Sequence, residues 1–124
     1  MKFKFEDLEV WQLGMRFTDK IYDLSIKYPE RERYNLISQL ISSATSIPLN
    51  IAEGSGKGSE KEFVRYIRIA IGSLFETDAN LKIAIRRKYL TEQDYKSLDE
   101  TIKELYFKLL GLEKSIKKRK NIPI

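Results

Sequence analysis

The stretch SIPLNIAEGSGKGS, residues 46–59, decides how this chain is organised. It contains one of the three prolines and three of the six glycines, in the middle of a sequence that otherwise follows helical periodicity. A proline inside a helix removes a backbone donor and crowds the carbonyl four residues earlier, and glycine is common where helices end. The stretch therefore predicts a kinked helix end and a loop, with one helical hairpin before it and another after it.

Two helices are predicted before the loop. The first runs from about residue 7 to residue 28, because Pro29 disfavours the helical conformation at the residue before it. The second follows a charged connection at residues 29–33, and its apolar residues keep their three- and four-residue steps beyond Pro48. This phase favours a kink near residues 44–48 over a stop. Gly54 is the predicted C-terminal cap of the second helix.

Two more helices are predicted after the loop. Ser59 and Glu62 have the spacing of a capping box, and the third helix continues to about Lys88. Thr91 caps the fourth helix, which carries the cleanest heptad row of the chain: Tyr95, Leu98, Ile102, Leu105, Leu109, Leu112 and Ile116. We therefore expect one all-α domain over residues 1–124, an antiparallel up-down-up-down four-helix bundle. The basic tail, residues 117–124, is expected to fray.

The composition argues against an enzyme. The chain has no cysteine and no histidine, which excludes Ser-His-Asp and Cys-His catalysis and the commonest metal ligands. We expect no catalytic residue, no cofactor and no metal; an enzyme acting through Glu53, Tyr66 or Glu76 is the least favoured alternative. The glycine-rich loop lacks the preceding strand and spacing of a phosphate-binding loop. With no apolar run of about 18–20 residues and no signal-peptide core, we expect a cytoplasmic protein that does not enter a membrane.

Positive charge is concentrated in the second half of the chain. The net charge is +5; residues 1–64 hold nine Lys/Arg and ten Asp/Glu, and residues 65–124 hold fourteen and eight. This asymmetry is compatible with a polyanionic partner contacted mainly through phosphates, and equally with a solvated basic face. The candidate nucleic-acid contacts are Arg65, Arg68, Arg86, Arg87, Lys88, Lys117, Lys118, Arg119 and Lys120.

Apolar residues also exceed what one stripe per helix requires. The additional rows contain Val10, Phe17, Ile21, Val64, Ile71, Phe75, Tyr106 and Leu110. Wide faces buried inside one bundle could account for them. We favour self-association, because exposed apolar rows commonly mark an interface.

Three ordered motifs resemble a known family. They are Ser46-Ile47-Pro48-x-Asn50-Ile51-Ala52-Glu53-Gly54, Asp7-Leu8-x-Val10-Trp11, and Ala70-x-Gly72-Ser73-Leu74-x-Glu76. Over about residues 5–113 the chain resembles the 23S rRNA-intervening sequence proteins, also called the S23 or four-helix bundle family. The resemblance implies an antiparallel four-helix bundle, a ring-like homopentamer and no established enzymatic activity. It assigns structural or interface roles to Ser46, Pro48, Asn50, Glu53 and Gly54.

The same family is similar in fold to the accessory variability protein of diversity-generating retroelements, a basic pentamer that binds a reverse transcriptase and nucleic acid. This chain departs from the family pattern in three places: Ile41-Ser42 replaces a basic pair, Leu49 a serine and Thr77 a leucine. Loss of the basic pair argues against RNA contact by the second helix. The basic residues of the third and fourth helices fall on no family motif.

Our leading hypothesis is a non-enzymatic oligomeric scaffold that engages RNA or a nucleic-acid enzyme through a basic surface. The alternative is a protein-binding adaptor without a nucleic-acid role.

Overall fold

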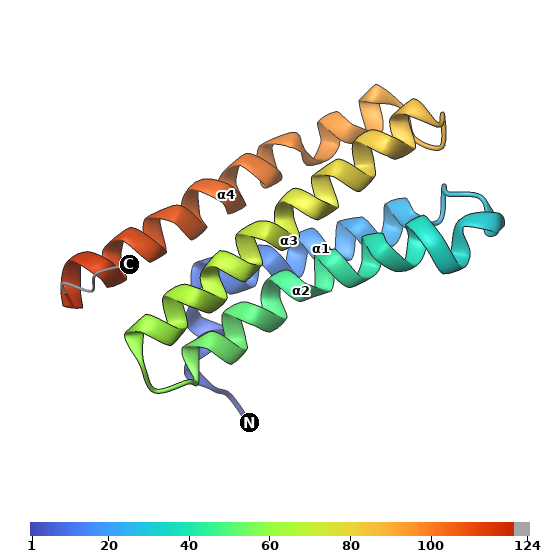
Figure 1. The fold of residues 1–124 in the computed structure, drawn as a ribbon. Coiled ribbons are helices and arrows are strands. Elements are labelled where there is room, and N and C mark those ends of the chain that lie inside the picture. The colour runs from blue at the N-terminus through green and yellow to red at the C-terminus, as the bar shows by residue number, and fades with distance from the viewer. Residues whose placement is uncertain (121–124) are drawn as a thin grey trace.

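Four long helices form the bundle that the sequence predicts (Figure 1). The computed structural model describes residues 1–120, and of Lys120 only the backbone. The helices are α1 (Glu9–Ser25), α2 (Ser38–Ser55), α3 (Glu60–Arg86) and α4 (Glu92–Lys120). They neighbour one another in ring order, so that α4 closes the bundle against α1. None of these helices combines the length and hydropathy needed to cross a membrane.

Both ends of the predicted first helix differ from expectation. A short 3-10 turn, Lys4–Asp7, precedes α1, and α1 ends at Ser25 rather than at residue 28. Beyond it the amides of Lys27 and Tyr28 donate to carbonyls three residues earlier, so the chain tightens before it reaches Pro29. A 3-10 turn (Glu30–Glu32) and a π-helical turn (Arg33–Ile37) then lead into α2.

The tail is more helical than predicted. Residues 117–120 continue α4 rather than fraying, and residues 121–124 lie outside the described part of the chain.

Side-chain caps set the start of α3 and α4. Ser59 Oγ accepts from the amide of Glu62 at 3.2 Å, whereas the Glu62 carboxylate turns to Arg65, so the predicted capping box is half formed. The second cap is reciprocal: Thr91 Oγ1 accepts from the amide of Asp94 at 3.0 Å, and Asp94 Oδ2 accepts from the amide of Thr91 at 2.9 Å. Asp94 therefore completes the capping box at the start of α4, whereas Glu62 leaves the box at the start of α3 incomplete.

The core accounts for most of the surplus apolar rows. Val10, Phe17, Ile21, Val64 and Ile71 are all buried within the chain. Expecting these five residues at an interface was wrong, because the faces of α1 and α3 are wide enough to contact two neighbouring helices each. The largest fully buried side chains include Phe17, Ile21, Leu40, Ile47, Ile51, Ile67, Leu74, Leu81, Leu98, Leu105, Leu109 and Ile116.

Helix α2 continues through Pro48, as the phase of its apolar residues predicted. Pro48 cannot donate to the carbonyl of Ala44. The Thr18 hydroxyl of α1 has a single proton, which it donates to the carbonyl of Gly14 at 2.8 Å and shares with the carbonyl of Ala44 at 3.3 Å. The Ala44 carbonyl therefore receives the longer branch of a shared hydrogen bond from outside α2. A Cβ on the buried Gly14 would lie 3.5 Å from Ile47 Cγ2 and 3.7 Å from the Pro48 ring. Helix α1 thus packs directly on the turn that the proline interrupts.

Replacing Thr18 by valine tests this joint. Thr18→Val keeps the shape and removes the hydroxyl, and it should lower the free energy of unfolding by about 1–2 kcal/mol, measured by urea denaturation. In a Pro48→Ala background residue 48 regains its amide donor to Ala44, so the same change should cost less. Equal costs in both backgrounds would show that the hydroxyl does not compensate for the proline.

A basic interface divided between two ends, and the motif of α2 and α3

The structure separates the predicted basic surface into two clusters. The turn cluster is Arg86, Arg87 and Lys88, at the turn between α3 and α4. The tail cluster is Arg65, Arg68, Lys117, Lys118 and Arg119, where α3 begins and α4 ends. These two regions occupy opposite ends of the bundle (Figure 1). Arg68 and Arg86 are 18 residues apart on one helix, or about 27 Å at 1.5 Å per residue. Lys120 belongs to the predicted set, but its side chain lies outside the description.

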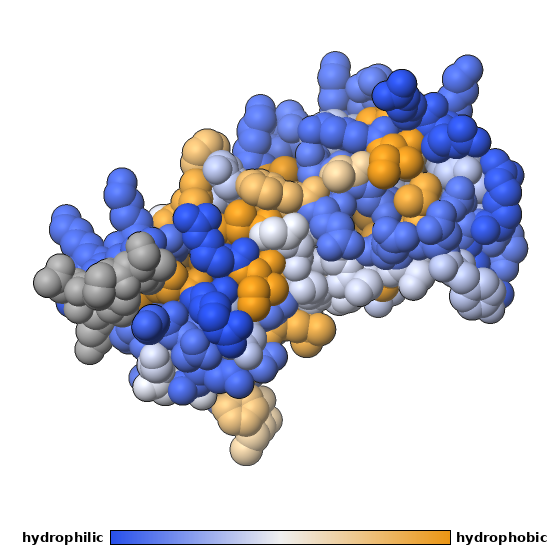
Figure 2. All heavy atoms as spheres, in the orientation of Figure 1, coloured by the Kyte–Doolittle hydropathy of each residue, from blue (hydrophilic) through white to orange (hydrophobic). Residues whose placement is uncertain are grey.

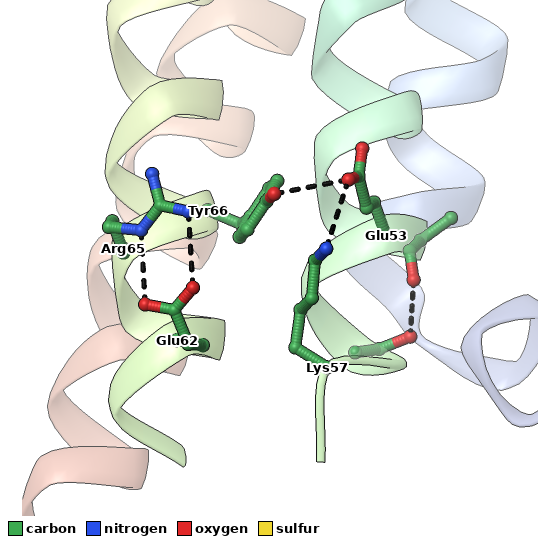
Figure 3. Close-up of polar contacts among 7 residues, drawn as sticks. Glu53, Lys57, Glu62, Arg65 and Tyr66 are labelled. Carbon is green, nitrogen blue, oxygen red and sulfur yellow. Dashed lines mark hydrogen bonds and ion pairs between the residues drawn. The ribbon is translucent and has the colours of Figure 1, made fainter. Parts of the chain in front are cut away.

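Two arginines of the tail cluster are neutralised by carboxylates. Arg65 grips Glu62 with two hydrogen bonds of 3.1 Å (Figure 3), and its guanidinium lowers the pKa of Glu62. Arg119 Nη2 donates to Glu60 Oε2 at 3.2 Å. Exposed pairs of this kind contribute little to stability. They do, however, occupy the guanidinium forks that a phosphate would need.

The buried carboxylate of Glu113 forms ion pairs with two more basic residues of the tail cluster. The Glu113 side chain is 6% exposed and lies between Arg68 Nε, 2.9 Å from its Oε1, and Lys117 Nζ, 2.7 Å from its Oε2. Oε1 receives no hydrogen bond, so its contact with Arg68 is an ion pair alone. Removing either cation would leave a buried charge less compensated. The Arg68–Glu113 pair therefore joins α3 to α4, whereas Lys117 contacts Glu113 within α4. A glutamate four residues after Leu109 and next to the heptad residue Leu112 is the signal that the sequence interpretation missed.

The turn cluster is unneutralised. Arg86, Arg87 and Lys88 are exposed and form no ion pair with any residue in 1–120. Lys88 takes a left-handed conformation, with φ of 66°, and the amide of Tyr89 donates to the carbonyl of Ala84 at 2.8 Å. This is the hydrogen bond of a Schellman turn. It presents three consecutive cations at the surface.

The connection between α1 and α2 packs against this turn. Arg31 lies over the Tyr89 ring, 5.6 Å from its centroid, and the Tyr89 hydroxyl donates to Glu32 at 2.8 Å. Nearby, Tyr34 in the π-helical turn is 89% exposed. The sequence interpretation treated residues 29–33 as a linker and did not place Arg31 with the turn cluster.

A buried tyrosine fixes that connection. The Tyr28 hydroxyl donates to Asn80 Oδ1 at 2.8 Å, and Asn80 Nδ2 donates to the carbonyl of Leu36 at 3.0 Å. Burial raises the pKa of the Tyr28 phenol. Both polar side chains are satisfied, so the end of α1 and the start of α2 are held against α3.

The motif in α2 forms a polar seam with α3. Ser46 Oγ lies 2.8 Å from Ser73 Oγ, and Asn50 Nδ2 donates to both the carbonyl and the hydroxyl of Ser46 at 2.7 Å. One turn along, Ser43 Oγ and Thr77 Oγ1 are 2.8 Å apart in the core. The buried hydroxyl of Thr77 is thereby matched by that of Ser43.

Glu53 lies at the open end of the seam. The Tyr66 hydroxyl donates to Glu53 Oε2 at 3.0 Å, and Lys57 Nζ is 3.4 Å from the same oxygen (Figure 3). The Asn50 amide donates to Ser46 and Glu53 contacts Tyr66 and Lys57, so the side chain nearest the Ala44 carbonyl that Pro48 leaves without a backbone donor is Thr18, at 3.3 Å. Within residues 1–120 no group of three His, Cys, Asp or Glu side chains could hold a metal ion.

Gly54 is a packing residue rather than the predicted cap. Helix α2 ends one residue later, with Gly56 in the cap position. A Cβ on Gly54 would lie 2.5 Å from Tyr66 Cβ and 3.2 Å from Phe63 Cδ1. Only glycine lets the first turns of α3 approach α2 this closely.

A pair of alanine substitutions separates packing from capping. Gly54→Ala should lower stability by about 1–3 kcal/mol, because the contact is with a Cβ that cannot rotate away. Gly56→Ala is the matched control, since its nearest neighbours would lie 3.7 Å away or more. Thermal melting of the two variants checks this, and equal melting temperatures would contradict the packing role.

The two polar motif residues should differ in the same assay. Asn50→Ala removes two short hydrogen bonds in a partly buried seam and should cost about 1 kcal/mol. Glu53→Ala removes contacts at an exposed site and should cost clearly less. A larger loss for Glu53 than for Asn50 would indicate that Glu53 has a role outside the subunit.

The class of protein follows from these features: an antiparallel four-helix bundle whose diagnostic residues pack helices together. The family model described as 23S rRNA-intervening sequence protein matches residues 6–111, and the chain belongs to this family. The chain is also similar to the crystal structure of a protein with unknown function from the S23 ribosomal protein family of Bacteroides thetaiotaomicron. That similarity has a TM-score of 0.77 and 27% identity, over 85% of this chain and 98% of the other. Comparison with curated proteins gives no significant match.

Proposed function

We propose that this protein is a non-enzymatic, homo-oligomeric helical scaffold of the cytoplasm that binds RNA through its turn cluster. The observation that carries the proposal is that Arg86, Arg87 and Lys88 form no ion pair with any residue of the described chain, 1–120. Arg31 adds a fourth cation at the same end, stacked on Tyr89. The family resemblance implies that the oligomer is a pentamer.

The chemistry of this end suits a flexible, single-stranded polyanion. Adjacent cations at a turn can contact successive phosphates, and the exposed Tyr34 ring, with Arg33 5.8 Å from its centroid, offers a face for base stacking. Assembly would repeat this site around a symmetry axis, so that several weak contacts act on one RNA. Either RNA alone or RNA held by a nucleic-acid enzyme could be the partner.

A protein-binding adaptor without a nucleic-acid role is the second candidate. The pairing of the tail cluster favours it, because Arg65, Arg68, Lys117 and Arg119 all face carboxylates of the same subunit. In this reading the basic charge supports the fold and keeps the surface hydrated.

Titration of a labelled single-stranded RNA separates the two functions. Three phosphate contacts predict an affinity that falls about 20-fold between 50 and 200 mM salt. Arg86→Glu/Arg87→Glu should weaken binding at least tenfold and reduce the salt dependence. The matched control, Arg16→Glu/Lys20→Glu, makes the same change of net charge on α1 and should bind nearly as the parent does. No binding by the parent protein, or equal losses in both variants, would favour the adaptor.

A further inference from the structure

An apolar groove runs along the outer side of α1 and α2. It has a volume of about 490 Å³, and the apolar residues that line it include Trp11, Met15 and Tyr22 of α1 and Leu49 of α2. Phe5 closes one end, edge-on to Trp11 with ring centroids 5.2 Å apart. Leu49 is 65% exposed. Of its large side chains, Met15, Tyr22 and Leu49 are exposed in the subunit.

A projecting apolar surface lies over α3 and α4. Phe75 and Phe107 are 56% and 65% exposed, and both rings contact Tyr106, with centroid distances of 5.6 and 5.2 Å. Apolar side chains follow the line between these two helices, bordered by hydrophilic residues (Figure 2).

We propose that the α1/α2 groove receives the α3/α4 aromatic surface of a second copy of this chain. The proposal rests on the homo-oligomer proposed above and names the two surfaces that meet. Because the helices neighbour one another in ring order, the groove and the aromatic surface face opposite sides of the bundle. A two-fold dimer through either surface would leave the other exposed. Head-to-tail contact covers both and closes into a ring when the rotation between copies allows it.

Asp19 of the α1/α2 groove and Lys114 near the α3/α4 aromatic surface are of opposite charge. Asp19 lines the groove and has no ion-pair partner within the described chain. On α4, Lys114 lies two turns after Phe107 and is likewise unpaired there, whereas Lys103, one turn before Phe107, is paired with Asp99 and Glu100. Groove-to-groove contact would bring two Asp19 carboxylates together, whereas groove-to-aromatic contact offers a lysine to each carboxylate.

The experiment uses two variants, each of which disables one surface. Met15→Glu/Leu49→Glu places charge in the groove, and Phe75→Ser/Phe107→Glu removes the aromatic projections. All four residues are exposed in the subunit, and circular dichroism checks that both variants fold. Ile26→Glu, at an 82% exposed site outside both surfaces, is the control and should keep the parental mass. Sedimentation velocity should then show each double variant as a monomer. Their equimolar mixture should form a one-to-one dimer and nothing larger, because one intact groove and one intact aromatic surface remain.

Other outcomes overturn the proposal in recognisable ways. An oligomer that survives either double variant excludes that surface from the interface, and two monomers that do not pair when mixed exclude their mutual contact. If a double variant misfolds, Leu49→Ser replaces the groove variant and should weaken assembly at least tenfold; unchanged assembly would exclude the groove. A monomeric parent protein would instead remove the homo-oligomer proposed above.

Discussion

The Thr18 hydroxyl lies between the carbonyls of Gly14 and Ala44, at the point where Pro48 leaves α2 without a backbone donor. A helix with an unsatisfied carbonyl in its middle would be expected to open to water there. Here α1 lies against that turn, and a Cβ on Gly14 would make ordinary van der Waals contact with Ile47 and Pro48. Helix α1 thus packs where α2 lacks the backbone hydrogen bond that Pro48 cannot donate. The missing bond is tolerated because α1 covers the Ala44 carbonyl.

On its other side, α2 packs closely against α3 through hydroxyl pairs and a glycine. Small and polar residues contribute to the contact with α3: Ser46 pairs with Ser73, Gly54 lies against Tyr66, and Asn50 holds Ser46 from within α2. Hydroxyl pairs and a glycine permit close approach where two rows of leucine would hold the helices apart. The motif that identifies the family is therefore best understood as the packing surface of the central helix on both of its neighbours.

Periodicity and caps were enough to predict four helices, their order and two of their N-terminal boundaries, because these depend on local sequence. What local sequence could not predict was which partner each polar residue finds. Thr18 falls in an apolar row, Glu113 lies beside the heptad row of α4, and Arg31 lies in a linker. Each acquires its role from a residue on another element. The same limit applies to the predicted basic surface, which the fold divides into two clusters. Charge counts along the chain also do not reveal that Arg68 and Lys117 both pair with the buried Glu113 carboxylate.

The outer surfaces remain for function: a groove, an aromatic projection and an unneutralised turn. The groove is formed by α1 and α2 together, and it can be rigid only if α2 behaves as one unit through Pro48. Native-state amide hydrogen exchange tests this most directly. The account predicts that amides in residues 49–54 exchange as slowly as those in residues 40–47, with one common free energy of opening. Much faster exchange after Pro48 would show that the end of α2 opens independently, and would contradict the account.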